Sequence, residues 1–131
     1  MAWVPQTEGT PNTHANRARA YWPGAAYVDW VGTDFYSRYP NFAGLNRFYS
    51  ARLYGAKPFV FGEWAMWGRD DPHFMRRFFS WVAAHPRVKM LAYNQGNTPK
   101  SEFRLYRYPR AARVMRRALK SPRYTARVTT P

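Results

Sequence analysis

The chain has 131 residues, a length that suits one domain and is about half of the ~250 residues in a complete (β/α)8 barrel. It has no cysteine, so disulfides and thiolate metal sites are excluded, and no apolar run approaches the ~20 residues of a membrane span. The net charge is +14, and aromatic residues make up 19% of the chain, more than core filling requires.

The order of apolar and turn-forming segments predicts strands that alternate with helices. We expect strands at 1–6, 27–32, 57–63 and 88–93. Helices are expected after the caps Asn41 and Asp71, and from Pro109 onward. Alternation of this kind is typical of parallel β/α units, so we expect an α/β fold. No Gly-rich phosphate loop follows a strand, so a dinucleotide site has no support.

The strongest candidate for chemistry is Glu63, which ends the apolar strand 57–63 between Gly62 and Trp64. Active sites of α/β folds lie at the carboxyl ends of their strands. A carboxylate beside an indole is suited to a sugar, because the acid can do the chemistry while the ring stacks on the pyranose face. The alternative is a buried structural glutamate paired with an arginine. We predict that Glu63 is functional.

Three polar residues near strand ends are further candidates for the site. Asp34 and Tyr36 are expected in the loop that follows strand 27–32. The Tyr36 hydroxyl can donate a hydrogen bond to Glu63 and hold it ionised. Asp34 can bind a sugar hydroxyl, or it can cap a turn. Asn94 follows the last predicted strand and can hydrogen-bond to hydroxyl groups.

Four aromatic residues lie at or just beyond strand ends, where exposed rings would stack on sugars. They are Trp22, Trp64, Trp67 and Tyr93. For each one, packing in the core or in a loop is the alternative. His14, His73 and His85 share no ligand spacing, so a zinc site is not expected.

Basic residues are concentrated toward the C-terminus, where residues 87–131 contain twelve Lys or Arg and one acid, Glu102. Such a block could meet nucleic acid, anionic lipid or an anionic polymer. The alternative, which we favour, is a solvated helix face followed by a tail. No nucleic-acid motif accompanies the block, so nucleic acid is not expected as a partner.

Three segments together resemble glycoside hydrolase family 26, the β-mannanase-like family of the large retaining (β/α)8 clan. They are Tyr21-Trp22-Pro23-Gly24, the run YVDWVGTDFY at 27–36 and the run KPFVFGE at 57–63. The resemblance extends over about residues 2–124. It implies an α/β fold that is the C-terminal half, strands five to eight, of a (β/α)8 TIM barrel. The partial glycoside hydrolase domain would cover 1–124, with a tail at 125–131.

The resemblance also implies roles for single residues. Glu63 matches the catalytic nucleophile at the end of the family's seventh strand, and Tyr36 matches the tyrosine that orients it. Tyr93 takes the place of an aromatic residue of the subsite floor. No residue matches the acid/base glutamate, which ends the family's fourth strand. A retaining mechanism needs that carboxylate about 5–5.5 Å from the nucleophile, so the fragment alone is expected to hydrolyse little. The chemistry requires no cofactor.

We therefore predict hydrolysis of O-glycosyl bonds in a β-mannan or related β-glycan, with retention and with Glu63 as nucleophile. The alternatives are a non-catalytic carbohydrate- or cell-wall-binding module and, ranked last, a nucleic-acid binder. An open half with two bare edges is expected to self-associate or to lack an N-terminal half-barrel. The resembling enzymes are usually exported, yet the N-terminus has no signal-peptide pattern, so no localisation is assigned.

Overall fold

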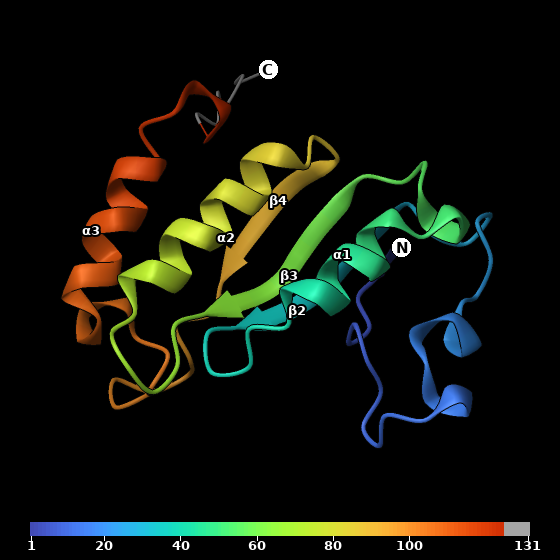
Figure 1. Ribbon diagram of the computed structural model, residues 1–131, viewed down its shortest axis with the longest axis horizontal. Coiled ribbons are helices and arrows are strands. Elements are labelled where there is room, and N and C mark those ends of the chain that lie inside the picture. The colour runs from blue at the N-terminus through green and yellow to red at the C-terminus, as the bar shows by residue number, and fades with distance from the viewer. Residues whose placement is uncertain (125–131) are drawn as a thin grey trace.

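The protein has an α/β fold in which parallel strands alternate with helices, as the sequence predicts (Figure 1). A computed structural model describes residues 1–124. The strands are β1 (Ala2–Trp3), β2 (Trp30–Tyr36), β3 (Phe59–Ala65) and β4 (Val88–Tyr93). The α-helices of this part are α1 (Phe42–Ser50), α2 (Pro72–Ala84) and α3 (Pro109–Ala118). The predicted tail at 125–131 lies outside the described residues.

The strands of the sheet follow the order of the chain. β1 pairs with β2, β2 with β3 and β3 with β4, all in parallel. Helices α1 and α2 lie on one face of the sheet, and α3 packs against α2 (Figure 1). On the opposite face Met90, which is level with Val60 and Gly32 in the pairing, is 52% exposed. The carboxyl ends of β2, β3 and β4 meet at one edge, where the loops that follow them begin.

Side-chain caps fix the start of two helices. The Asn41 side chain accepts a hydrogen bond from Gly44 N at 2.8 Å. The Asp71 carboxylate accepts from His73 N at 2.9 Å and from Phe74 N at 3.0 Å. These bonds satisfy amides that have no partner inside a helix. Both caps agree with the sequence prediction, as do the start of α3 and the bounds of β4.

The bounds of β1, β2 and β3 differ from the prediction. β3 covers Phe59–Ala65 instead of 57–63, so Glu63 lies two residues before its end, and β2 begins at Trp30 instead of Tyr27. β2 does not end at Gly32, because Phe35 and Tyr36 still pair with Trp64 and Ala65 of β3. The expected loop at 33–40 is therefore wrong in its first half, which belongs to a strand. β1 covers two residues instead of the six expected, because only these two pair with β2.

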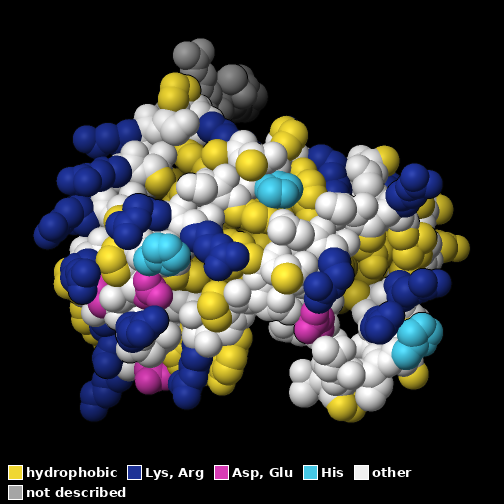
Figure 2. Space-filling view, viewed as in Figure 1, with side chains coloured by type: hydrophobic (Ala, Val, Ile, Leu, Met, Phe, Trp, Pro, Cys, Tyr) yellow, Lys and Arg dark blue, Asp and Glu magenta, His cyan; other side chains and the backbone are white. Residues whose placement is uncertain are grey.

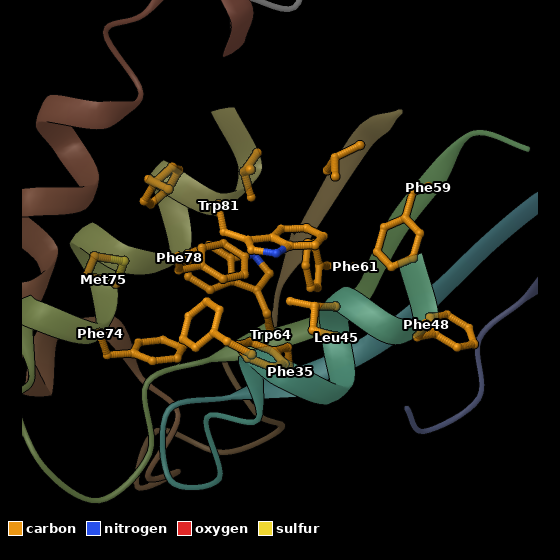
Figure 3. Packing of buried hydrophobic residues seen from close by; sticks show 14 of the residues in the cluster. Phe35, Leu45, Phe48, Phe59, Phe61, Trp64, Phe74, Met75, Phe78 and Trp81 are labelled. Carbon is orange, nitrogen blue, oxygen red and sulfur yellow. The ribbon is translucent and has the colours of Figure 1, made fainter. Parts of the chain in front are cut away.

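Aromatic side chains fill the space between the sheet and helices α1 and α2 (Figure 3). Phe78 of α2 lies at the centre and has no exposed surface. Its ring centroid lies 4.2 Å from that of Trp64, 4.9 Å from Phe61 and 6.2 Å from Phe35. Such ring pairs add roughly 0.5–1.5 kcal/mol each beyond the burial of their area. Much of the aromatic content thus serves the core.

Basic side chains line the outer side of α3 (Figure 2). Ala111 and Ala112 are buried, while Arg113, Arg116 and Arg117 are exposed. None of these three arginines has an ion-pair partner among residues 1–124. The helix thus has the solvated basic face that the sequence indicated. Over the same residues, no helix combines the length and the apolar character needed to cross a bilayer.

Candidate functional site

A β-bulge in β3 turns the side chain of Glu63 away from the core. Phe61 pairs with Thr33 of β2, but the next pair joins Trp64 to Phe35, so β3 has one residue more than β2. The pairing with β4 shifts at the same place. In an uninterrupted strand, Glu63 would share the core face with Phe61. With the extra residue Trp64 enters the core, and Glu63 is exposed on the other face.

The residues next to the bulge hold it in place. A Cβ atom at Gly62 would lie 2.8 Å from Val4 Cγ1 and 3.3 Å from Asp34 Oδ1, so there is little room for any side chain. The Glu63 amide donates a hydrogen bond to Asp34 Oδ1 at 2.9 Å. A side chain of β2 thus serves as acceptor for an amide where the bulge disrupts the ladder. The Asp34 side chain therefore positions Glu63 by binding the backbone amide of Glu63, a role that the sequence did not predict.

Two side chains from the neighbouring strands hold the Glu63 carboxylate. The Tyr36 hydroxyl donates a hydrogen bond to Glu63 Oε2, and Asn94 Nδ2 donates to the same oxygen at 3.1 Å. Asn94 Oδ1 in turn accepts from Gly96 N at 2.7 Å, which fixes the orientation of the amide. The predicted bond from Tyr36 to Glu63 is confirmed, and Asn94 lies beside it.

Tyr36 acts as a hydrogen-bond donor at neutral pH. Burial and the hydrogen bond to Glu63 raise the pKa of Tyr36 to about 12, so the hydroxyl keeps its proton. Glu63 itself is exposed and has no cation as partner within residues 1–124. The alternative of a buried glutamate neutralised by an arginine is therefore excluded for this part of the chain.

Asp34 is the second carboxyl group of this site. Burial raises its pKa above the ordinary value of 3.8, and repulsion by the Glu63 carboxylate raises it further. The folded state therefore binds this proton more tightly than the unfolded state does. The contribution of Asp34 to stability is fully present below pH 3.8 and is lost as the pH rises through its folded-state pKa.

We expect Asp34→Asn to remove this pH dependence, because asparagine keeps an oxygen acceptor for the Glu63 amide but cannot ionise. The free energy of unfolding of the variant, relative to the unchanged protein, should rise between pH 3.8 and 7. Urea denaturation at several pH values measures it. Asp29→Asn is the control, because the N-terminal ammonium lowers the pKa of Asp29, so its contribution changes below pH 3.8 and its difference should stay nearly constant from pH 3.8 to 7. A constant difference for Asp34→Asn across this range would contradict the prediction.

Two of the aromatic residues predicted to stack on sugars, Trp64 and Tyr93, pack against each other. Trp64 is 1% exposed and stacks on Phe78, so it belongs to the core. The Tyr93 ring packs edge-on against Trp64 at 4.9 Å. Its hydroxyl donates to Phe103 O at 3.0 Å and accepts from Met66 N at 3.2 Å, and burial raises its pKa to about 12. The prediction of Trp64 as a platform is wrong, because its ring is buried in the core, whereas Tyr93 is partly exposed and its role in the subsite floor stays a prediction.

Trp22 lies toward the other end of the sheet. Its ring packs edge-on against Trp3 at 4.9 Å and against Tyr54 at 5.1 Å. Trp3 is beside the start of β2, and Tyr54 comes shortly before β3. The prediction of Trp22 as a sugar platform beside Glu63 is therefore wrong.

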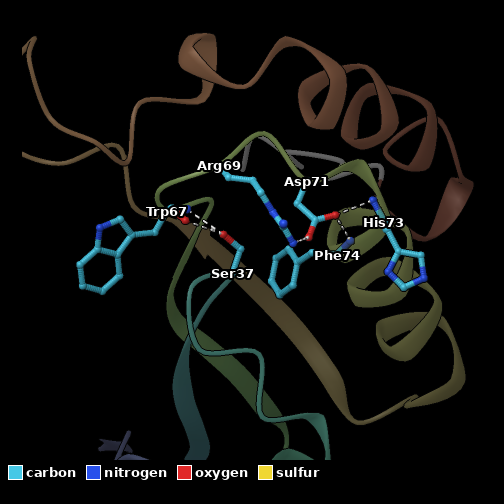
Figure 4. A network of polar contacts seen from close by, with 6 residues as sticks. All are labelled: Ser37, Trp67, Arg69, Asp71, His73 and Phe74. Carbon is cyan, nitrogen blue, oxygen red and sulfur yellow. Dashed lines mark hydrogen bonds and ion pairs between the residues drawn. The ribbon is translucent and has the colours of Figure 1, made fainter.

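Trp67, by contrast, belongs to an aromatic cluster at the carboxyl edge. Its ring centroid lies 5.9 Å from Tyr36, 5.6 Å from Tyr39 and 5.5 Å from Phe103. Two hydrogen bonds join the Ser37 hydroxyl to the Trp67 backbone and tie the loops after β2 and β3 together (Figure 4). Sequence reasoning missed Tyr39 and Phe103. The available signal was their position in loops that follow β2 and β4, which open at the same edge.

Five of the seven acidic residues of the chain lie at this edge, although the chain as a whole is basic. They are Asp34, Glu63, Asp70, Asp71 and Glu102. Asp70 accepts from two amides at the start of α3, Asp71 caps α2, and Glu102 accepts from the Trp67 indole at 2.8 Å. Asp34 accepts from the bulge. Glu63 differs from the other four because two neutral side chains, those of Tyr36 and Asn94, donate to its carboxylate.

Fold and site together define an α/β protein with an ordered, exposed carboxylate at the carboxyl edge of a parallel sheet. No family model matches the chain, and no curated protein shows a significant match. Among residues 1–124, no three His, Asp or Glu side chains gather as ligands of a metal ion. The function is therefore argued from the geometry of the site.

Proposed function

We propose that the chain is the nucleophile-bearing half of a retaining β-glycosidase, with Glu63 as the nucleophile. One observation carries the proposal: the Glu63 carboxylate is exposed, free of cations among the described residues, and oriented by Tyr36 and Asn94. A nucleophile must be ionised and must be held toward the atom it attacks. A donated hydrogen bond from a neutral tyrosine serves both needs without neutralising the charge.

The topology supports a half-barrel of four parallel strands as the finer description of the fold, with an α-helix after each of β2, β3 and β4. Strands in chain order with helices on one face suit a (β/α)8 barrel, whereas doubly wound sheets place helices on both faces. Neither β1 nor β4 has a neighbour on its outer side within the described residues. The face that α1 and α2 leave open would then be the interior of the barrel.

In the proposed step, a Glu63 oxygen forms a bond to the anomeric carbon of a β-linked sugar. The bond from that carbon to the leaving oxygen breaks, and the electron pair departs with the oxygen. Natural leaving groups need a proton at this moment, and no residue here matches the family's acid/base glutamate. The isolated chain is therefore proposed to perform this first step only on sugars whose leaving group needs no proton.

An activated sugar tests the proposal on the chain as it exists. The probe is 2,4-dinitrophenyl 2-deoxy-2-fluoro-β-mannoside. Its dinitrophenyl group leaves as a stable phenolate, and the fluorine slows the later release of the sugar from the protein. We expect intact mass spectrometry to show one added fluorosugar, mapped to the peptide that contains Glu63. The corresponding glucoside tests whether mannose is preferred. Labelling at random carboxylates, or no labelling at millimolar reagent, would overturn the assignment.

We further propose that the open face and the two edges lead to self-association, because unpaired parallel strands offer ready hydrogen-bonding groups. Light scattering after size exclusion should give more than one chain per particle. Met90→Asp should shift the population toward the monomer, because Met90 lies on the open face. Leu53→Asp, at an apolar site with 49% exposure outside the sheet, should not. A well-folded monomer at tens of micromolar would contradict this proposal.

The second candidate function is a carbohydrate-binding module without turnover. The aromatic cluster of Tyr36, Tyr39, Trp67 and Phe103 favours it, since rings at a loop edge can stack on sugars. Binding of an oligosaccharide without any covalent labelling of Glu63 would identify the chain as such a module.

A further inference from the structure

A hollow of about 300 Å³ lies between the loops that follow β2 and β3. It is lined by Ser37, Arg38, Trp67, Gly68, Arg69 and Asp71. The hollow adjoins the Glu63 site, because Tyr36 directly precedes Ser37 and its ring lies against Trp67. Figure 4 shows Arg69 extending from its loop toward Asp71, with Ser37 nearby. The volume is at the lower end of the range for small-ligand sites, enough for one part of a larger ligand.

The hollow carries an excess of positive charge. The Arg38 guanidinium lies 4.9 Å from the ring centroid of Trp67 and 5.9 Å from that of Tyr39, positions that favour an ordered cation. Arg38 has no ion-pair partner among residues 1–124. Arg69 pairs with Asp71 at 3.4 Å, while Asp71 also accepts two amides of α2. The lining of the hollow thus contains two guanidinium groups and one carboxylate, and that carboxylate already accepts hydrogen bonds from two amides.

The other acids of this edge do not cancel that charge. Glu102 is engaged by the Trp67 indole, and Asp70 is engaged by the first amides of α3. The net charge of +14 further raises the concentration of anions around the chain. A neutral glycan would leave Arg38 without an anionic partner. A planar carboxylate, by contrast, matches the fork of N–H donors on the guanidinium group.

We propose that this hollow binds the carboxylate of a uronic-acid unit, so that the glycan presented to Glu63 is an acidic β-glycan. The inference rests on the proposed function and names its substrate class. Arg38 supplies the charged contact, and Trp67 supplies an apolar surface beside it. Tyr36, which joins the two sites in the chain, holds Glu63 within reach of the same saccharide.

The test compares two β-1,4-linked tetrasaccharides, one of mannuronic acid and one of mannose. They differ at C6, which is a carboxylate in the first and a hydroxymethyl group in the second. Binding to the full chain is measured by calorimetry at low and at physiological salt. We expect the acidic tetramer to bind about tenfold more tightly than the neutral one. Arg38→Gln should remove that preference, because it weakens binding of the acidic tetramer far more than binding of the neutral one. Arg113→Gln, on the outer face of α3, is the matched control, because it also removes one positive charge at an exposed site.

Each outcome decides the proposal. Equal affinity for both tetramers, unaffected by Arg38→Gln, overturns the acidic subsite and leaves the proposed function in place. Equal losses from Arg38→Gln and from the α3 control show attraction by net charge alone, which also overturns the subsite. Binding of neither tetramer, with no labelling of Glu63 by the fluorosugar, removes the proposed function and the subsite with it.

Discussion

Glu63→Gln is expected to abolish labelling by the activated fluorosugar, with a loss of at least ~10⁴-fold in rate. Glutamine has nearly the same shape and keeps an oxygen for the hydrogen bonds from Tyr36 and Asn94. It lacks the negative charge that attacks the anomeric carbon, so the effect isolates nucleophilicity from structure. The rate of dinitrophenolate release at 400 nm, together with intact mass, measures it.

Tyr36→Phe is the variant to compare with Glu63→Gln. It leaves the Glu63 carboxylate in place but removes one donor, so labelling should slow by roughly 10²-fold and should still map to Glu63. Circular dichroism should be unchanged for both variants, because neither side chain belongs to the buried core cluster. Full labelling of Glu63→Gln would show that another carboxylate is the nucleophile and would end the assignment.

Phe78→Ala is expected to produce the largest loss of stability. Phe78 is fully buried and its ring lies against Trp64 and Phe61 of β3 and Phe35 of β2. Removing such a ring costs about 3–5 kcal/mol, a large part of the ~5–15 kcal/mol that stabilises a typical domain. The midpoint of urea unfolding should fall by about 2 M.

Tyr27→Ala is the control, because Tyr27 is 69% exposed and its loss leaves no cavity. Its midpoint should change little. Phe78→Leu should fall between the two, because leucine refills part of the space. A Phe78→Ala variant as stable as Tyr27→Ala would show that the aromatic cluster of Figure 3 is not the centre of the core.

The sequence predicted the fold class because its strongest signals act locally. Asn and Asp are preferred caps at the start of a helix, and an apolar helical pattern follows both Asn41 and Asp71. Both residues cap a helix in the structure. The strand around Glu63 was evident from a run of apolar residues, and its carboxyl end marked the place of the site. The bond from Tyr36 to Glu63 could be predicted because both residues lie at the ends of neighbouring strands.

The features that the sequence did not predict depend on how the strands pair with one another. The bulge at Gly62 and Glu63 exchanges the faces of Glu63 and Trp64, so Trp64 lies in the core. An isolated glycine in a strand is a known sign of a bulge, and Gly62 was the available signal. Trp22 was misplaced for another reason: its partners Trp3 and Tyr54 are brought to it by sheet pairing, which no local pattern records.

The bond from the Glu63 amide to Asp34 has a consequence for assembly. Among the described residues, the groups that hydrogen-bond to Glu63 are Asp34 and Tyr36 of β2 and Asn94, which directly follows β4, so they come from the two neighbours of β3 in this one sheet. The reactive geometry is therefore preset before any second protein arrives. Under the proposed function, a separate chain that completes the barrel would have to supply the proton donor at the carboxyl edge. It would not have to supply any group that positions Glu63. Under that proposal, mixing this chain with a separately purified companion should be enough to produce activity on natural glycans.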